Sequence, residues 1–458
     1  MTVEPLGRLI HECSLPGERR ADDVFPAHPN GLQASRSTWL LLYATRGWRA
    51  VDDDRSIVYQ LRRGAPHGDL VTEGALAAAA DDWDATGDGT RYVRQHGHPV
   101  LFGLPKGALI DGREPAHAGL FVAKWRIKAM GRVDPATGTV SRDHDLWERT
   151  QGVRWAQFRL NDHEDDIEVV QPAAELRQQG WESGPRFCAA DVRWMNQTFT
   201  QAVPYAEDGA ADGSQWVDGT QWVDVNHFDG GRVAALRYWF DAGAGVYRWT
   251  DTGPLVAGPG PWRHSEASIA RCDDGWIIAT RASTADRDGS HATGWVRTAD
   301  PFADVSDLTL AADPPTASPR TLYRCPDGVL RLLSGDPHAS PYGLGRNPLY
   351  LWDLDPRTLT TSHRREVFDC VATGTLPRET DPVADMGKLL PHAGGRVQWV
   401  VWRVRTRNVH HTYADPTEGA RVASAYGFPP LRDEWKEPQG IYYGRITYDG
   451  DLPGLWRL

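Results

Sequence analysis

Two segments of this chain repeat one strand–turn–strand pattern, 53 residues apart. Residues 268–281 and 321–333 each place a Cys-x-Asp-Gly turn between two apolar runs, and residues 225–236 and 389–402 are looser copies. Asp-Gly favours a tight hairpin, because both central residues of a type I′ turn take positive φ. Hairpin repeats of roughly 40–50 residues are typical of β-propeller blades. The repeat therefore predicts a propeller.

Other strand-like runs support this fold. Each is short, rich in β-branched or aromatic residues and closed by turn residues, and the clearest are 37–44, 56–61, 120–125 and 233–240. The 46 glycines and 32 prolines are spread along the whole chain, which favours one continuous fold. Residues 73–84, with their run of alanines, are the one fair helix candidate.

The chain length sets the number of blades. At about sixty residues per blade, 458 residues predict seven blades. We therefore expect an all-β, seven-bladed propeller of four-stranded antiparallel blades, with residues 1–458 forming a single domain. The 20 tryptophans fit packing between the blades and around a central mouth.

Charge and composition exclude several classes of partner. A net charge of −11 argues against nucleic acid, which needs a basic face. No run approaches the roughly 18 apolar residues of a membrane span, and the first residues lack the features of a signal peptide. These observations predict a cytoplasmic protein, or a secreted one if a leader was removed. The five cysteines lack C-x-x-C spacing, so we expect buried apolar side chains rather than a zinc site or disulfides.

Three histidines carry the strongest signal for chemistry. His96 and His98 precede the strand-like run 99–102, and His117 precedes the run 120–125, so we expect them near one another at two strand starts. Imidazole takes and gives protons near neutral pH. Alternation along a strand puts His96 and His98 on the same face, and either could act. His264 and Arg320 open two further strands and are expected at the same funnel.

The metal signals are weaker. The runs 143–145 and 410–411 contain ligand types without the spacing of a closed zinc site. Residues 162–166 have the clustered oxygens that calcium prefers, although a charged hairpin tip is the simpler interpretation. We expect that no cofactor is required, with a structural calcium ion as the alternative. Phosphate-binding glycine loops and the G-x-S-x-G motif are absent.

The Asp-Gly hairpin repeats resemble those of the sialidase-like propellers over nearly the whole chain. Within residues 94–125, the histidines His96, His98 and His117 resemble the paired histidines of the propeller polysaccharide lyases. That family includes ulvan lyases and lyases that cleave L-rhamnose-α-1,4-D-glucuronate.

The resemblance implies β-elimination at a uronic acid in an acidic oligo- or polysaccharide. An arginine would neutralise the C6 carboxylate, a base would remove the C5 proton, and an acid would protonate the leaving O4. On this interpretation His117 and one of His96 or His98 carry the proton transfers. The remaining candidates bind substrate, with an arginine as the carboxylate clamp; they are Arg154, Arg159, Arg193, His264 and Arg320.

One departure from the lyases leaves alternatives open. Several of them use a tyrosine in the next blade, but this chain has none between Tyr92 and Tyr205. Either a histidine acts as both the base and the acid, or the protein is a glycoside hydrolase of the rhamnosyl-glucuronate or sialidase-like type. A true sialidase is disfavoured, because no Arg-Ile-Pro motif and no regular Asp-boxes are found. A non-catalytic carbohydrate-binding propeller is the third alternative.

Overall fold

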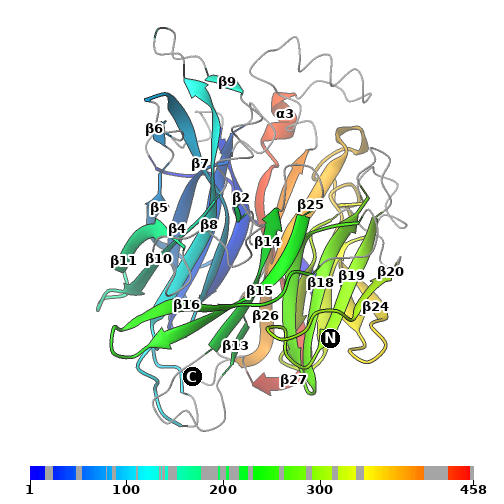
Figure 1. The fold of residues 1–458 in the computed structure, drawn as a ribbon. Helices are drawn as coiled ribbons and strands as arrows, with labels where there is room; N and C mark the ends of the chain where they lie inside the picture. The colour runs from blue at the N-terminus through cyan, green and yellow to red at the C-terminus, as the bar shows by residue number, and fades with distance from the viewer. Residues whose placement is uncertain are drawn as a thin grey trace.

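Antiparallel β-strands make up most of the structure, a computed structural model (Figure 1). It describes residues 1–15, 24–47, 54–78, 80–84, 89–109, 112–133, 136, 140–142, 152–176, 194–195, 203–205, 216–224, 231–256, 262–284, 291–311, 318–336, 345–392, 394–406 and 432–453. Within these residues the strands form six sheets, which we call blades 1 to 6.

The first three blades contain four or more strands each. Blade 1 consists of β2 (Val24–Gln33), β3 (Thr38–Gly47), β4 (Asp54–Arg63) and β5 (Leu70–Ala77). Blade 2 consists of β6 (Ala80–Asp84), β7 (Arg91–Gly103), β8 (Leu120–Val133), β9 (Val140–Arg142), β10 (Gly152–Leu160) and β11 (Ile167–Glu175). Blade 3 consists of β12 (Trp194–Met195), β13 (Val203–Tyr205), β14 (Trp216–Asp224), β15 (Gly231–Asp241) and β16 (Val246–Thr252).

The last three blades are four-stranded. Blade 4 consists of β17 (Arg263–Cys272), β18 (Gly275–Ser283), β19 (His291–Thr298) and β20 (Leu308–Ala311). Blade 5 consists of β21 (Thr321–Arg324), β22 (Leu330–Gly335), β23 (Leu349–Leu354) and β24 (Thr361–Phe368). Blade 6 joins β25 (Pro382–Leu389), β26 (Gly394–Thr406) and β27 (Gly440–Pro453) to β1 (Thr2–Ile10) from the start of the sequence.

Short helical turns interrupt the strands. They are a 3-10 turn η2 (Arg378–Thr380) and a helix α3 (Asp433–Lys436). No helix in the described part of the chain is long and apolar enough to cross a membrane.

Six apolar clusters join each blade to the next and close the ring. The clusters lie between blades 1 and 2, 2 and 3, 3 and 4, 4 and 5, 5 and 6, and 6 and 1. A central strand can contribute side chains to two clusters, because successive side chains point to opposite faces. In β3, for example, Leu40 and Leu42 face blade 2, whereas Leu41 and Tyr43 face blade 6. Burial on both faces explains the nearly continuous apolar runs of the sequence.

The propeller of four-stranded antiparallel blades agrees with the sequence analysis, but the described residues show six blades instead of seven. The estimate assumed about sixty residues per blade, whereas blade 2 alone extends from residue 80 to residue 175. The predicted repeat is confirmed: its two copies are the β17–β18 and β21–β22 hairpins of successive blades. The strands predicted around 37–44, 56–61, 120–125 and 233–240 are confirmed as β3, β4, β8 and β15.

The helix predicted over residues 73–84 is wrong. Residues 73–77 form the end of β5, and residues 80–84 form β6. Ala75 and Ala77 pair with Val58 and Ile57 of β4. Pairing with an existing sheet outweighs the helix propensity of alanine, which amounts to less than about 1 kcal/mol per residue. The cysteine prediction holds for Cys13, Cys272, Cys325 and Cys370, which are buried free thiols; Cys188 lies outside the described residues.

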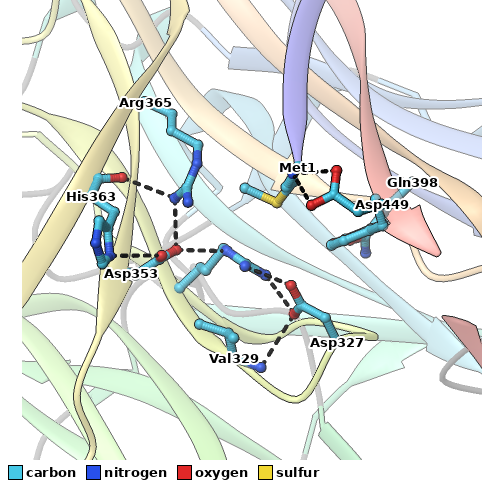
Figure 2. A network of polar contacts seen from close by, with 10 residues as sticks. Met1, Asp327, Val329, Asp353, His363, Arg365, Gln398 and Asp449 are labelled. Carbon is cyan, nitrogen blue, oxygen red and sulfur yellow. Dashed lines mark hydrogen bonds and ion pairs between the residues drawn. The ribbon is translucent and has the colours of Figure 1, made fainter.

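A polar network spans the joint between blades 5 and 6 (Figure 2). Arg331 of β22 donates two hydrogen bonds to Asp327, both at 2.7 Å, and one to Asp353 at 2.8 Å. Its guanidinium also lies 5.8 Å from the ring centroid of Tyr448 on β27. The Tyr448 hydroxyl donates to Gln398 of β26 at 2.7 Å. This network connects the two blades beside their apolar cluster.

Candidate functional site

A repeated bulge marks one strand in each of four blades. Strands β2, β7, β17 and β25 lose register at Ala27/Asn30, Gly97/Val100, Ser265/Ser268 and Asp385/Lys388. Each break holds a residue with positive φ other than glycine: His28, His98, Glu266 and Met386. Such backbone is uncommon outside glycine, and bulges aim side chains at functional sites. Strand β2 contacts both β7 and β25, and β21 contacts both β17 and β25, so these strands surround the ring centre.

The rings of two bulge histidines lie against each other across the joint between blades 1 and 2. The ring centroids of His28 and His98 lie 3.8 Å apart, with the planes tilted by 46°. Both side chains are buried. The bulges therefore bring imidazoles from positions 28 and 98 into one site.

Two buried arginines reach this pair from neighbouring strands. Arg46 of β3 places Nη1 3.2 Å from His28 Nε2, and Arg403 of β26 places Nη1 2.5 Å from the same atom. Burial lowers the pKa of His28 well below its usual value, and the charges of His98, Arg403, Arg46 and Arg126 lower it further. Arg126 of β8 lies opposite Gly97 in the β7–β8 register. The pair is thus surrounded by cations.

One buried carboxylate orders the arginines around it. Asp385 accepts hydrogen bonds from Arg403 Nε at 2.9 Å and from Arg346 Nη1 at 3.0 Å. Arg405 lies further away, with Nη2 3.9 Å from the Asp385 carboxylate. Burial alone would raise the pKa of Asp385, but the three arginines lower it to about 2. Asp385 is therefore ionised, and it holds Arg403 against His28.

A second polar group lies in blade 4 and at the start of blade 5. Glu266, the bulge residue of β17, forms an ion pair with Arg281 of β18 at 2.7 Å. His264 Nδ1 lies 2.8 Å from Thr280 Oγ1, and burial lowers the pKa of His264 to about 4. Arg320 Nε donates to Thr293 Oγ1 at 2.9 Å. The structure thus brings His264 and Arg320 to adjacent residues of the β18–β19 pair, in which Thr280 faces Gly294.

His96 and His98 do not share an environment. The bulge at Gly97/Val100 interrupts the alternation that would have put them on one face. The Trp125 indole donates to His96 Nδ1 at 3.0 Å. Burial and the charges of Arg94 and Arg154 lower the pKa of His96 to about 3. His96 is a neutral side chain packed between blades, with Arg154 nearby.

His117 lies away from both His96 and His98. It precedes β8, where the bridge between Leu104 and Ala118 marks the far end of β7. Because β7 and β8 are antiparallel, the start of β8 meets the end of β7, about 20 Å along the strand from His98 at roughly 3.3 Å per residue. The His117 ring instead lies 4.8 Å from that of Phe240 in blade 3. The expected meeting of His117 with His98 is not found.

The remaining candidates are spread out. Arg154 and Arg159 lie on β10 and are half-buried, and Arg193 lies outside the described residues. Residues 162–166 form the β10–β11 turn, where Glu164 accepts hydrogen bonds from Ser35 and Thr38. No group of metal-ligating side chains occurs within the described ranges, and residues 143–145 and 410–411 lie outside them.

The sequence patterns did not indicate His28, Arg46, Arg126, Arg403 or Asp385. One signal was available: His28-Pro29 repeats the His98-Pro99 pair of the next blade. The arginines and Asp385 carry no such signal, because they converge only through the packing of separate blades.

The described blades form a β-propeller whose centre is rich in buried cationic side chains. No protein-family model and no curated protein match the chain. Among solved structures, it is similar to a Dyadobacter fermentans protein of unknown function, with a TM-score of 0.51 and 11% identity over 97% of this chain and 99% of that one. This match supports the fold.

Two carbohydrate-active enzymes are similar at lower scores. The Penicillium chrysogenum alpha-L-arabinanase has a TM-score of 0.46 and 11% identity over 98% of this chain and 99% of that one. A Trypanosoma rangeli sialidase has a TM-score of 0.48 and 9% identity over 89% of this chain and 56% of that one.

Proposed function

We propose that this propeller binds an acidic carbohydrate at the His28–His98 pair and cleaves it beside a uronic acid by β-elimination. The observation that carries the proposal is the convergence of Arg46 and Arg403 on His28, whose ring lies against that of His98 from the adjacent blade. Guanidinium groups suit carboxylates, and a neutral imidazole can accept a proton. A glucuronate residue, as in rhamnosyl-α-1,4-glucuronate, provides both the carboxylate and an acidic C–H bond.

The proposed reaction needs only side chains. The surrounding arginines stabilise negative charge on the C6 carboxylate, which makes the C5 proton more acidic. His98 takes this proton, the electron pair of the C5–H bond forms the C4–C5 double bond, and the C4–O4 bond breaks. His98 then returns the proton to O4 of the leaving sugar. One imidazole thus acts as base and acid, and the proposal requires neither a tyrosine nor a cofactor.

The test uses the absorbance of the unsaturated uronate. We expect the protein to produce ultraviolet absorbance from rhamnose-capped glucuronate glycans or from ulvan. His98→Gln should lower the rate by at least about 100-fold, the usual contribution of a proton-transfer group. The matched control is His363→Asn, because His363 is exposed on β24, outside the site. Full activity of the His98 variant would reject this residue as the base.

Glycoside hydrolysis is the second candidate, and Glu266 favours it. Hydrolysis typically uses two carboxylates, and Glu266 occupies the same bulge position in β17 as His98 does in β7. Released reducing sugar without ultraviolet absorbance, lost in Glu266→Gln, would replace elimination by hydrolysis. Binding of acidic glycans without any product would leave a non-catalytic carbohydrate-binding propeller.

A further inference from the structure

The contacts of His28 determine where its proton lies. Both Arg46 Nη1 and Arg403 Nη1 face the same ring atom, Nε2. A guanidinium group donates hydrogen bonds and accepts none. His28 Nε2 must therefore present its lone pair, and the neutral ring holds its hydrogen on Nδ1.

The surroundings of His28 keep the ring neutral. The charged and titratable groups that act on it are Arg46 from β3, Arg403 from β26, Arg126 from β8 and His98 from β7. All of them are cationic or can become so. A second proton would place an Nε2–H group against two guanidinium donors in a buried site. The Asp385 carboxylate does not offset this repulsion at the His28 ring, because it accepts its hydrogen bonds from Arg403 and Arg346.

The other ring nitrogen of His28, Nδ1, carries the hydrogen in this tautomer and is a hydrogen-bond donor. His28 Nδ1 is buried and has no hydrogen-bond partner among the described residues. A buried donor that lacks a partner costs about 1–3 kcal/mol, which a bound oxygen atom would recover.

We infer that His28 is a neutral hydrogen-bond donor, through Nδ1–H, to a carboxylate oxygen of the substrate, with its tautomer set by Arg46 and Arg403. This inference rests on the proposed elimination and assigns the two imidazoles different roles. As His98 removes the C5 proton, negative charge grows on the C6 carboxylate oxygens. His28 stabilises that charge through its hydrogen bond and transfers no proton. A neutral donor held in place before the reaction is effective at such a position.

The first test is independent of substrate. In ¹⁵N-histidine-labelled full-length protein, long-range ¹H–¹⁵N spectra distinguish the two tautomers from the cation. We expect the His28 signals, assigned by their absence in His28→Asn, to show Nδ1–H and to stay unchanged from pH 5 to pH 8. Exposed His363, which lies outside the site, is the internal reference for the histidine signals. An Nε2–H tautomer, or protonation in this range, overturns the inference.

The second test compares two variants in the ultraviolet assay. His28→Asn keeps an N–H donor near the Nδ1 position, whereas His28→Leu keeps similar volume without a donor. We expect His28→Leu to lower kcat by about 100-fold or more with a small change in KM, and His28→Asn to recover at least about tenfold of the loss. Thermal midpoints check that both variants fold.

The outcomes separate the two proposals. Equal kcat for the wild type and His28→Leu overturns the donor role. A wild-type protein without elimination activity rejects the proposed function, and the spectra still decide the tautomer.

Discussion

Asp385 shows how one residue organises the cation-rich centre. Its carboxylate is fully buried and bonded to Arg403 and Arg346. Removing one partner of a buried ion pair usually costs more than the pair contributes, because the other charge is left uncompensated. Asp385 is thus as important for stability as for the position of Arg403.

We expect Asp385→Asn to destabilise the fold by about 3–5 kcal/mol at pH 7, measured by urea unfolding. The folded pKa of Asp385, about 2, lies below its unfolded value of 3.8. Its contribution is therefore complete above about pH 4 and is lost as the pH falls to 2. The difference between variant and wild type should shrink over that interval.

Asp241→Asn is the control for this prediction. Asp241 forms its ion pair with Arg248 on an exposed turn. We expect little change in its unfolding midpoint. An equal loss in both variants would contradict the special role of the buried carboxylate.

At residue scale the sequence indicated His98 but not its neighbour. The assumption of regular alternation placed His96 beside His98, whereas the bulge with its positive φ turned His98 toward His28. Bulges depend on the pairing of whole strands, so local composition does not reveal them. The roles predicted for His96, His117 and the β10 arginines stay predictions.

At the scale of elements, β5 shows tertiary pairing overriding local propensity. Gly74 faces Tyr59 of β4, and a Cβ atom added at Gly74 would lie 2.5 Å from the tyrosine hydroxyl oxygen. The Tyr59 hydroxyl is itself fixed by its hydrogen bond to Asp166 at 2.6 Å. The glycine thus makes room for an aromatic ring that links blades 1 and 2.

We expect Gly74→Ala to lower the free energy of unfolding by about 1–3 kcal/mol, because the added methyl group forces Tyr59 to move. Chemical denaturation measures the effect. Gly450→Ala is the matched control, since nothing lies within 4 Å of its added Cβ. Its expected change is at most about 0.5 kcal/mol. A stabilising effect at Gly74 would contradict the close contact.

At the scale of the whole molecule, six apolar joints and the pairing of β1 with β27 close the ring. The polar network of Figure 2 reinforces the joint between blades 5 and 6. Arg331 is nearly inaccessible there, and it connects Asp327, Asp353 and the ring of Tyr448. Replacing Arg331 should therefore weaken the contact between blades 5 and 6, and not only the strand that carries it.

We expect Arg331→Met to destabilise the protein by about 3 kcal/mol, because the partly buried Asp327 loses its cation and Asp353 loses one of two, while the methionine keeps the packing on Tyr448. Differential scanning calorimetry measures the loss. Arg365→Met removes a more exposed partner of Asp353 and should cost less than about 1 kcal/mol. Equal effects of the two variants would refute the greater role of the buried arginine.

The sequence by itself determined the all-β class, the four-stranded blade pattern and the hairpin repeat, because strand periodicity and turn residues are local properties. It also nominated His98, together with His96 and His117, as a candidate for proton transfer. Only the tertiary structure decided the number of blades, the separation of His96 and His117 from His98, and the gathering of His28, Arg46, Arg403 and Asp385. The number of blades depends on how many sheets pack side by side before the ring closes. The site depends on side chains from three blades, whose meeting no local pattern records.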